Sequence, residues 1–189
     1  DTRILKNDAT TTVGIVNIDG SELAIKRYNI KGFSHALKRS IRPSRAALCW
    51  EHAHMLLAAG ICTPPPVAMI EKRYGFFRST AYFINEYTPA KDIFEYLKTA
   101  DIEARTQIAE NISALFQQLN HWGITHGDLK PENILIRDKK PVLLDLDSLR
   151  IYPRRGWFFK RAHQKDINRF LKNWEEYPDI EKIFERSGG

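Results

Sequence analysis

The chain has 189 residues, 43% of them hydrophobic and 28% charged, and its formal net charge is +6. That apolar content excludes an intrinsically disordered chain, and the length suits one domain or a compact two-lobed one. The two cysteines, Cys49 and Cys62, lie in unrelated contexts and indicate a reducing compartment without disulfides, which favours the cytoplasm. No apolar run reaches the length of a membrane span. The positive charge favours an anionic partner, such as a nucleotide, a nucleic acid or a membrane surface.

The first 28 residues predict an antiparallel meander of three strands. Residues 4–18 contain two strands around a polar turn. The pair Asp19-Gly20 is typical of a hairpin turn, and a third strand covers residues 22–28. Lys26 lies on this third strand. Without further context, a lysine on an apolar strand is more often a surface residue whose aliphatic stem covers apolar neighbours.

A helix is predicted over residues 44–59, after a segment rich in bases. Ser44 suits the N-cap of this helix, and Gly60 suits its end. The apolar residues that we expect on its core-facing side are Leu48, Met55, Leu56 and Ala59. The basic residues of the segment are Lys31, Lys38, Arg39, Arg42 and Arg45.

The middle of the chain predicts two more strands and a long helix. Three prolines within residues 60–66 cannot continue a helix and form a stiff, extended connection. Strands over residues 67–71 and 80–86 then complete a five-stranded antiparallel sheet. The long amphipathic helix covers residues 101–122, and its apolar stripe consists of Ile108, Ile112, Leu115, Phe116 and Leu119.

The segment Ile124-Thr-His-Gly-Asp-Leu-Lys-Pro-Glu-Asn-Ile-Leu-Ile136 concentrates chemistry, because an Asp, a Lys and an Asn fall within positions 128–133. A second apolar run, residues 142–144, ends in Asp145-Leu146-Asp147. We therefore expect a loop followed by a tight hairpin, with a proton-accepting or metal-binding residue at one end of each strand. Phosphoryl transfer needs such a set: a carboxylate near the attacking hydroxyl, a cation near the phosphate, and side-chain oxygens that hold Mg²⁺.

The string HGDLKPEN followed by DLD resembles the catalytic loop and the metal-binding aspartate of the protein-kinase-like superfamily. The resemblance implies a two-lobed α+β fold. Residues 1–87 would form an N-lobe of five antiparallel strands plus the αC helix, and residues 88–189 a reduced, mostly helical C-lobe. Its implied functional residues are Asp128 as catalytic base, Lys130 on the phosphate side, and Asn133 and Asp145 as Mg²⁺ ligands, with ATP as phosphate donor.

Further residues of the first lobe follow from the same resemblance. The stretch Leu23-Ala-Ile-Lys26 is similar to the kinase strand whose lysine contacts the α- and β-phosphates. Glu51 would pair with that lysine, as the αC glutamate does. Residues 85–89 resemble the hinge between lobes, so main-chain groups of Glu86, Tyr87 and Thr88 would contact adenine, with Asp92 as a candidate for ribose or substrate contact.

The first turn departs from the kinase pattern, because residues 6–13 contain no glycine. Two interpretations stay open. Main-chain N–H groups and the hydroxyls of Thr10, Thr11 and Thr12 cover the phosphates, or the turn is an ordinary hairpin without a nucleotide contact.

Three departures point to one subfamily. Gly127 stands where an Arg usually precedes the catalytic Asp, Asp145-Leu-Asp147 replaces Asp-Phe-Gly, and few residues remain after Arg150 for peptide-docking helices. This set resembles the bacterial lipopolysaccharide core kinases, which phosphorylate a Kdo or heptose sugar of the inner core on the cytoplasmic face. Asp147 would be a second metal ligand or a charge partner of Arg150.

The last part of the chain is rich in bases and aromatics, above all between Arg154 and Arg161. This segment would contact the inner membrane surface, or its aromatics pack inward while its bases face water. RNA binding is a third interpretation, although we expect no nucleic-acid partner. A helix is predicted over residues 166–174, with Ile167, Phe170 and Leu171 facing inward, and a last amphipathic segment covers residues 178–184.

Two other functions remain as alternatives. Small atypical protein kinases, either of the RIO group or of tRNA-modification complexes, also have short C-lobes. A pseudokinase scaffold that binds nucleotide without transferring phosphate would fit the glycine-free first turn. The presence of Lys26, Asp128, Asn133 and Asp145 together argues against the scaffold.

Overall fold

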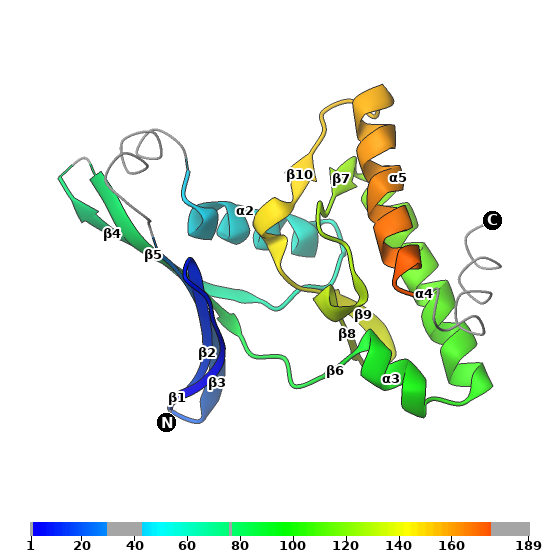
Figure 1. Cartoon of the computed structure of the whole chain (residues 1–189), viewed down its shortest axis with the longest axis horizontal. Coiled ribbons are helices and arrows are strands. Elements are labelled where there is room, and N and C mark those ends of the chain that lie inside the picture. The colour runs from blue at the N-terminus through cyan, green and yellow to red at the C-terminus, as the bar shows by residue number, and fades with distance from the viewer. Residues whose placement is uncertain (1, 30–42, 76, 175–189) are drawn as a thin grey trace. The chain divides into compact units, whose positions relative to one another are not determined.

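The computed structural model describes residues 2–29, 43–75 and 77–174, and these fall into two compact units (Figure 1). The first unit comprises residues 1–58 and 64–88, and the second comprises residues 59–63 and 89–189. The predicted α+β class, an antiparallel sheet combined with helices, is confirmed. The division of the chain into an N-lobe of residues 1–87 and a C-lobe of residues 88–189 stays a prediction.

The first unit is built on a five-stranded antiparallel sheet with the order β1-β2-β3-β5-β4. Its β2–β3 hairpin pairs Ile18 with Ser21, and both turn residues, Asp19 and Gly20, have positive φ angles of 51° and 83°. Such angles give a turn whose twist matches that of the flanking strands. The strands are β1 (Thr2–Asn7), β2 (Thr11–Ile18), β3 (Ser21–Tyr28), β4 (Pro66–Tyr74) and β5 (Phe77–Glu86).

Helix α2 (Arg45–Ala58) packs on β4 and β5 of this sheet. The Ser44 Oγ accepts a hydrogen bond from the Ala47 N–H at 3.0 Å, which confirms the predicted N-cap. The predicted core face is wrong in part: of its four residues, Leu56 is buried, whereas the other three are only partly covered. Small residues, Ala46, Cys49 and Ala53, occupy the buried side instead, because they allow the helix to approach the sheet closely.

The described part of the second unit, residues 59–63 and 89–174, combines three α-helices with short strands. One sheet has the order β6-β8-β9, and β7 pairs with β10 in a second. The helices are α3 (Ile93–Thr99), α4 (Ile102–His121) and α5 (Trp157–Lys172). The other elements are β6 (Lys91–Asp92), β7 (Ile124–Thr125), η1 (Pro131–Asn133), β8 (Ile134–Arg137), β9 (Lys140–Leu143), η2 (Leu146–Ser148) and β10 (Arg150–Ile151).

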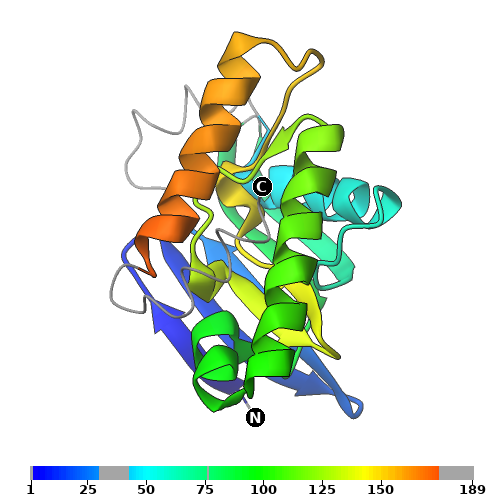
Figure 2. The same ribbon diagram turned by 90° about the vertical axis from the view of Figure 1, so that its right-hand side faces the viewer.

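Helices α4 and α5 lie side by side, as Figure 2 shows, with the rings of Phe116 and Phe170 5.2 Å apart at their contact. Asp101 caps α4 by accepting the Ala104 N–H at 2.8 Å. The predicted apolar stripe of α4 is buried at four of its five positions, and Phe116, the fifth, is half-buried. None of the helices in residues 2–29, 43–75 and 77–174 has the length and apolar character that crossing a bilayer requires.

The structure differs from the sequence predictions at two places in the second unit. Helix α3 was not predicted, and Asp92 caps it by accepting the Glu95 N–H at 2.8 Å. The contact of Asp92 with ribose or substrate stays a prediction. Helix α5 begins at Trp157 and not at Asp166. The predicted amphipathic segment over residues 178–184 and the basic residues Lys31, Lys38, Arg39 and Arg42 lie outside the described residues.

Candidate active site

The candidate active site is the loop between β7 and η1, which continues directly into the β8–β9 hairpin. The hairpin turn consists of Asp138 and Lys139, both with positive φ, as a tight two-residue turn requires. At the other end of the hairpin, the Leu144 N–H donates to the Asn133 carbonyl at 2.9 Å. The hairpin therefore brings Asn133 to the point where Asp145 leaves the second strand, as the sequence predicted.

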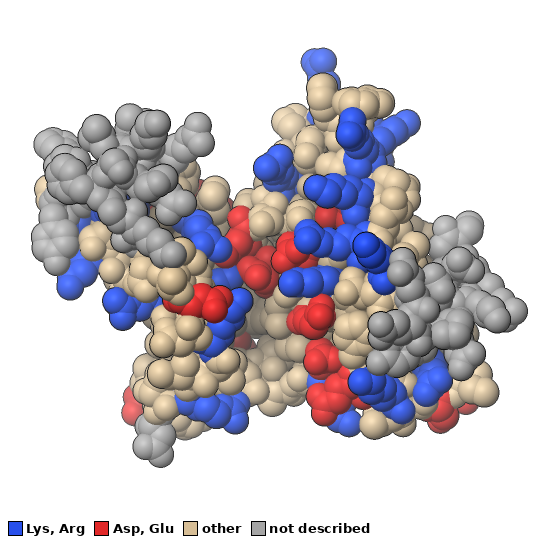
Figure 3. Space-filling view, viewed as in Figure 1, with Lys and Arg blue, Asp and Glu red and all other residues tan. Residues whose placement is uncertain are grey.

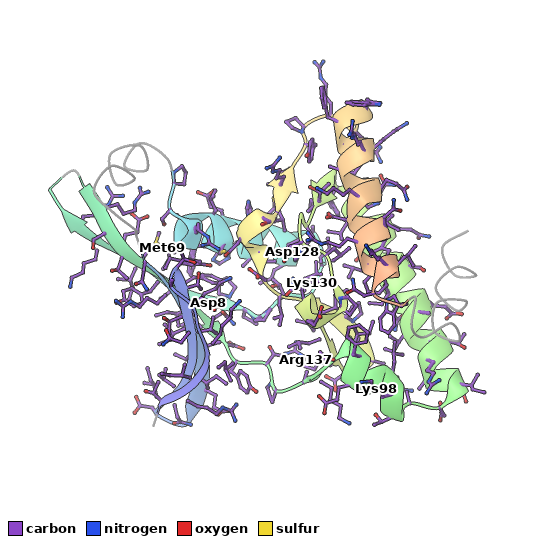
Figure 4. The ribbon with its side chains drawn as sticks, viewed as in Figure 1. Asp8, Met69, Lys98, Asp128, Lys130 and Arg137 are labelled. Atoms are coloured by element: carbon purple, nitrogen blue, oxygen red, sulfur yellow. The ribbon has the colours of Figure 1, made fainter. Side chains whose placement is uncertain are left out.

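The Asp128 carboxylate lies between two cations. Its Oδ1 is 2.8 Å from Nη1 of Arg169, and its Oδ2 is 3.6 Å from Nζ of Lys130. Figure 4 shows Asp128 and Lys130 close together on the loop. The Asp128 side chain keeps 29% of its surface exposed, so a substrate hydroxyl has room to reach the carboxylate.

Asn133 is buried and ties the hairpin to the loop. Its Nδ2 donates to the Asp128 carbonyl at 2.9 Å. Since a carbonyl only accepts, the nitrogen of the amide must face it, which leaves the amide oxygen as the atom suited to a metal ion. Asp145 is exposed, with φ 55° and ψ 62°. An amide oxygen and a carboxylate are hard ligands of the kind that Mg²⁺ uses together with phosphate oxygens.

Asp166 of α5 holds the loop backbone from below the surface. This carboxylate is only 4% exposed, and it accepts the His126 N–H at 2.7 Å and the Gly127 N–H at 3.0 and 3.1 Å. The His126 ring lies against the other side of the loop, where its Nε2 is 2.8 Å from the Leu144 carbonyl and therefore donates to it. The buried N–H of His126 and the partly buried N–H of Gly127 thus share a charged acceptor, which fixes the backbone that carries Asp128.

Gly127 occupies a position where no other residue fits. Its φ is +81°, and a Cβ built there would lie 2.5 Å from the Ser148 carbonyl oxygen of η2. Backbone strain and a direct clash therefore both exclude a side chain. This is the physical reason for one departure from the kinase pattern, the glycine before the candidate catalytic Asp.

Sequence reasoning missed Asp166 and Arg169. The buried residues of α5 are Phe159, His163, Asp166 and Phe170, spaced by four, three and four positions. An aspartate in a core stripe needs a polar partner, so this spacing was a readable signal. Arg169 gave no such signal, because an exposed arginine on a helix is ordinary.

His163 lies one turn before Asp166 and stacks on Phe159, with ring centroids 5.4 Å apart. Burial lowers the pKa of His163 below its ordinary value, while the nearby Asp166 carboxylate acts in the opposite direction. Folding therefore shifts this imidazole toward its neutral form relative to the unfolded chain.

The predicted nucleotide residues of the first unit lie on β3, α2 and the end of β5. Lys26 on β3 is partly buried, with its Nζ 5.4 Å from the centroid of the Tyr28 ring. Glu51 is exposed on α2, and its pairing with Lys26 stays a prediction. At the end of β5, the N–H groups of Glu86 and Tyr87 donate to the carbonyls of Pro65 and Glu22, both at 2.9 Å. These two N–H groups are therefore used within the unit.

The glycine-free turn between β1 and β2 is closed by its own backbone. The Asp8 N–H donates to the Thr11 carbonyl at 2.8 Å, and Thr11 donates back at 3.3 Å. The Thr12 hydroxyl donates to Asn7 Oδ1 at 3.0 Å, and Lys6 forms an ion pair with Asp8 at 2.9 Å. Phosphate contact by this turn, like the role of Asp147, stays a prediction.

The fold and the candidate catalytic loop are those of the kinase-like class of proteins. A family model described as the lipopolysaccharide kinase (Kdo/WaaP) family matches residues 3–185. The chain therefore belongs to this family, and the assignment made from the sequence is confirmed.

Solved structures support the fold. The chain is similar to a structure of WaaP in complex with acyl carrier protein, with a TM-score of 0.71 and 14% identity, covering 98% of this chain and 77% of that one. It is also similar to the Cydia pomonella granulovirus kinase PK-1, with a TM-score of 0.55 and 18% identity over 83% of this chain and 55% of that one.

Two curated relatives match less than half of the chain. Serine/threonine-protein kinase D of Synechocystis is 30% identical over 87 residues, 44% of this chain and 17% of that protein. Serine/threonine-protein kinase RAD53 of Saccharomyces cerevisiae is 30% identical over 77 residues, 38% of this chain and 9% of that protein. The chain thus spans less than a fifth of the length of these relatives.

Proposed function

We propose that this protein is an ATP-dependent bacterial kinase that transfers the γ-phosphate to a sugar hydroxyl of the lipopolysaccharide inner core, on Kdo or heptose. One observation carries the proposal: the Asp128 carboxylate is held 2.8 Å from Arg169 and 3.6 Å from Lys130, on a loop tied to Asn133. Membership of the lipopolysaccharide kinase family supports the class of acceptor.

The second unit would carry the chemistry. Asp128 orients the acceptor hydroxyl, whose oxygen bonds to the γ-phosphorus as the bond to the β,γ-bridging oxygen breaks and ADP leaves. The hydroxyl proton passes to the Asp128 carboxylate and then to solvent. Lys130 offsets negative charge on the transferred group. Its Nζ lies 3.6 Å from Asp128 Oδ2, so this cation is beside the carboxylate that orients the hydroxyl. When bound, Mg²⁺ would neutralise phosphate charge, and Asn133 and Asp145 would hold it.

The first unit would bind the nucleotide. Lys26 contacts the α- and β-phosphates, and Glu51 holds Lys26 in place. Main-chain groups of Glu86 to Thr88 contact adenine. The N–H groups of Glu86 and Tyr87 are already used, and the Glu86 carbonyl accepts the Asn85 side-chain amide at 2.8 Å. The Thr88 N–H and the carbonyls of Tyr87 and Thr88 are therefore the groups that we assign to this contact.

The start of α5 would place the protein on the inner face of the cytoplasmic membrane. Trp157 and Phe158 are 63% and 76% exposed, and the Arg161 guanidinium lies 5.3 Å from the Trp157 ring centroid. Lys and Arg side chains gather over this end of the second unit (Figure 3). Exposed aromatics beside bases suit an anionic lipid surface, where a lipid-anchored acceptor would be found.

Phosphate transfer from γ-labelled ATP with Mg²⁺ tests the function. The acceptors are a Kdo-containing lipid A precursor, core lipopolysaccharide and a generic protein, with Asp128→Asn as the blank. We expect label in a glycolipid, and we expect the variant to lose about 100- to 10,000-fold in rate while it still binds ATP. Label in protein alone favours an atypical protein kinase. ATP binding without any transfer favours the scaffold.

Sedimentation with lipid vesicles tests the membrane surface separately. We expect binding to vesicles that contain phosphatidylglycerol and little binding to pure phosphatidylcholine. The double variant Trp157→Ala/Phe158→Ala should lose this binding. Ile102→Ala, which removes a 78% exposed side chain from the start of α4, is the matched control and should keep it. Equal binding by both variants would contradict the assignment.

A further inference from the structure

Helix α5 contacts three successive residues of the catalytic loop through two of its side chains, one turn apart. Asp166 accepts the N–H groups of His126 and Gly127. Arg169 pairs with the carboxylate of the third residue, Asp128. Residues three apart on a helix share one face, so a single surface of α5 reaches both the backbone and the functional side chain of the loop.

Arg169 makes two contacts with the loop through the same nitrogen. Its Nη1 lies 2.8 Å from Asp128 Oδ1 and 3.4 Å from the Gly127 carbonyl oxygen. The first distance is that of a close ion pair. Lys130 lies 3.6 Å from the other oxygen, beyond hydrogen-bond distance, so Arg169 is the cation that fixes the direction of the carboxylate.

The loop has no room for an arginine at position 127, directly before Asp128. Position 127 requires a positive φ, and any Cβ there would meet the Ser148 carbonyl oxygen at 2.5 Å. An arginine directly before Asp128 is therefore excluded by the backbone. Arg169, forty-two positions from Gly127, brings a guanidinium beside Asp128 from helix α5.

We propose that Arg169 is the positioning residue for Asp128, the candidate catalytic base, and that it holds Oδ1 so that Oδ2 is presented to the acceptor hydroxyl. This inference rests on the proposed kinase function. The cation belongs to a helix of the folded unit, so the carboxylate is oriented without a phosphorylated activation segment.

Phosphoryl transfer tolerates this arrangement. In a loose transition state the bond between the attacking oxygen and phosphorus is little formed, so the hydroxyl still holds its proton and the carboxylate is needed chiefly to orient it. An ion pair on Oδ1 therefore improves orientation and leaves Oδ2 to accept the hydroxyl proton. A displaced carboxylate, in contrast, lowers the rate steeply, since a misplacement of about 1 Å can lower a rate about 100-fold.

The ion pair has little part in holding the fold together. The side chains of Arg169 and Asp128 are 47% and 29% exposed, and ion pairs in contact with water contribute little to stability. A variant at position 169 is therefore expected to fold, which allows its effect on the rate to be measured.

The test compares initial rates of Arg169→Gln, Arg169→Lys, Arg169→Ala and the wild type. Lys165→Gln, which removes an exposed cation one turn earlier on α5, is the matched control. We expect Arg169→Gln to lower kcat by about 10- to 100-fold with an unchanged KM for ATP and a melting temperature close to that of the wild type. Arg169→Lys should restore part of the loss. Added guanidinium at millimolar concentration should accelerate Arg169→Ala and leave Lys165→Gln unchanged.

The outcomes separate this inference from the proposed function. An active wild type with a fully active Arg169→Gln overturns the positioning role and leaves the kinase assignment in place. A loss of kcat that neither lysine nor guanidinium restores, with a lowered melting temperature, also overturns it, because the role would then be structural. A wild type that transfers no phosphate to any acceptor overturns both.

Discussion

The turn between β1 and β2 and the loop between β7 and η1 are both short polar segments, but they are held in different ways. The first is closed by hydrogen bonds between Asp8 and Thr11, three positions apart, and its residues lie mostly at the surface. The second is held by Asp166 and Arg169, about forty positions further along the chain. A segment fixed by distant, partly buried charges has one defined geometry, which is what a catalytic carboxylate needs.

Of the substitutions that test this difference between the two segments, Asp166→Ala is expected to have the largest effect on stability and on phosphate transfer. The substitution leaves the buried N–H of His126 and the N–H of Gly127 without their acceptor, which should lower the free energy of unfolding by about 2–4 kcal/mol and also slow transfer. Urea unfolding measures the loss. Asp101→Ala, which removes an exposed helix cap, is the matched control and should lower it by about 1 kcal/mol. Equal losses for the two variants would mean that the buried Asp166 carboxylate stabilises the fold no more than an exposed helix cap does.

Gly127→Ala is expected to have the next largest effect. Its Cβ would meet the Ser148 carbonyl oxygen at 2.5 Å, so the loop must shift, and both transfer and stability should fall. Gly20→Ala is the matched control, because its φ of +83° is nearly the same but the space around it is open. The control should show only the strain of the backbone, about 1–2 kcal/mol by urea unfolding. If both variants lose the same stability and Gly127→Ala keeps full activity, the close approach to Ser148 has no importance.

A smaller effect is expected from pH through His163. Because burial lowers its pKa in the folded state, the unfolded chain binds a proton just below pH 6.5 that the folded chain does not. The free energy of unfolding should therefore rise with pH up to about 6.5 and then level off. His163→Gln should flatten this rise when unfolding is followed at a series of pH values. A steeper rise in the variant would show that the histidine is favoured in its protonated form.

The smallest effect is expected in the first unit, from Thr10→Ala/Thr12→Ala. The Thr12 hydroxyl is bonded to Asn7 within the turn, so we expect the KM for ATP to change by no more than about twofold, as for surface substitutions generally. Steady-state kinetics over a range of ATP concentrations measures it. A tenfold rise in KM would show that these hydroxyls cover the phosphates.

The sequence predicted what is encoded locally. The hairpin strands of the first unit, the N-cap Ser44, the α4 stripe and the loop with Asp128 and Asn133 all follow from patterns a few residues long. The family was predicted correctly for the same reason, since the HGDLKPEN string is contiguous. The roles assigned to individual site residues remain predictions.

The rest depends on contacts between distant segments. Which side of α2 is buried depends on how closely its small residues approach β4 and β5, and the periodicity of larger apolar residues does not show this. The first residues of α5 are mostly aromatic and basic, so the sequence indicated a surface segment where the structure has the start of a helix. Asp166 was detectable as a charge in a core stripe, whereas Arg169 could be assigned only once the structure placed it beside Asp128.

Mass spectrometry of the glycolipid after incubation with ATP, Mg²⁺ and the wild-type protein tests the central claim most directly. The account predicts one added phosphate on a Kdo or heptose residue of the inner core, and no addition with Asp128→Asn. A glycolipid of unchanged mass, in a reaction where the protein itself or an added protein gains the phosphate, would contradict it.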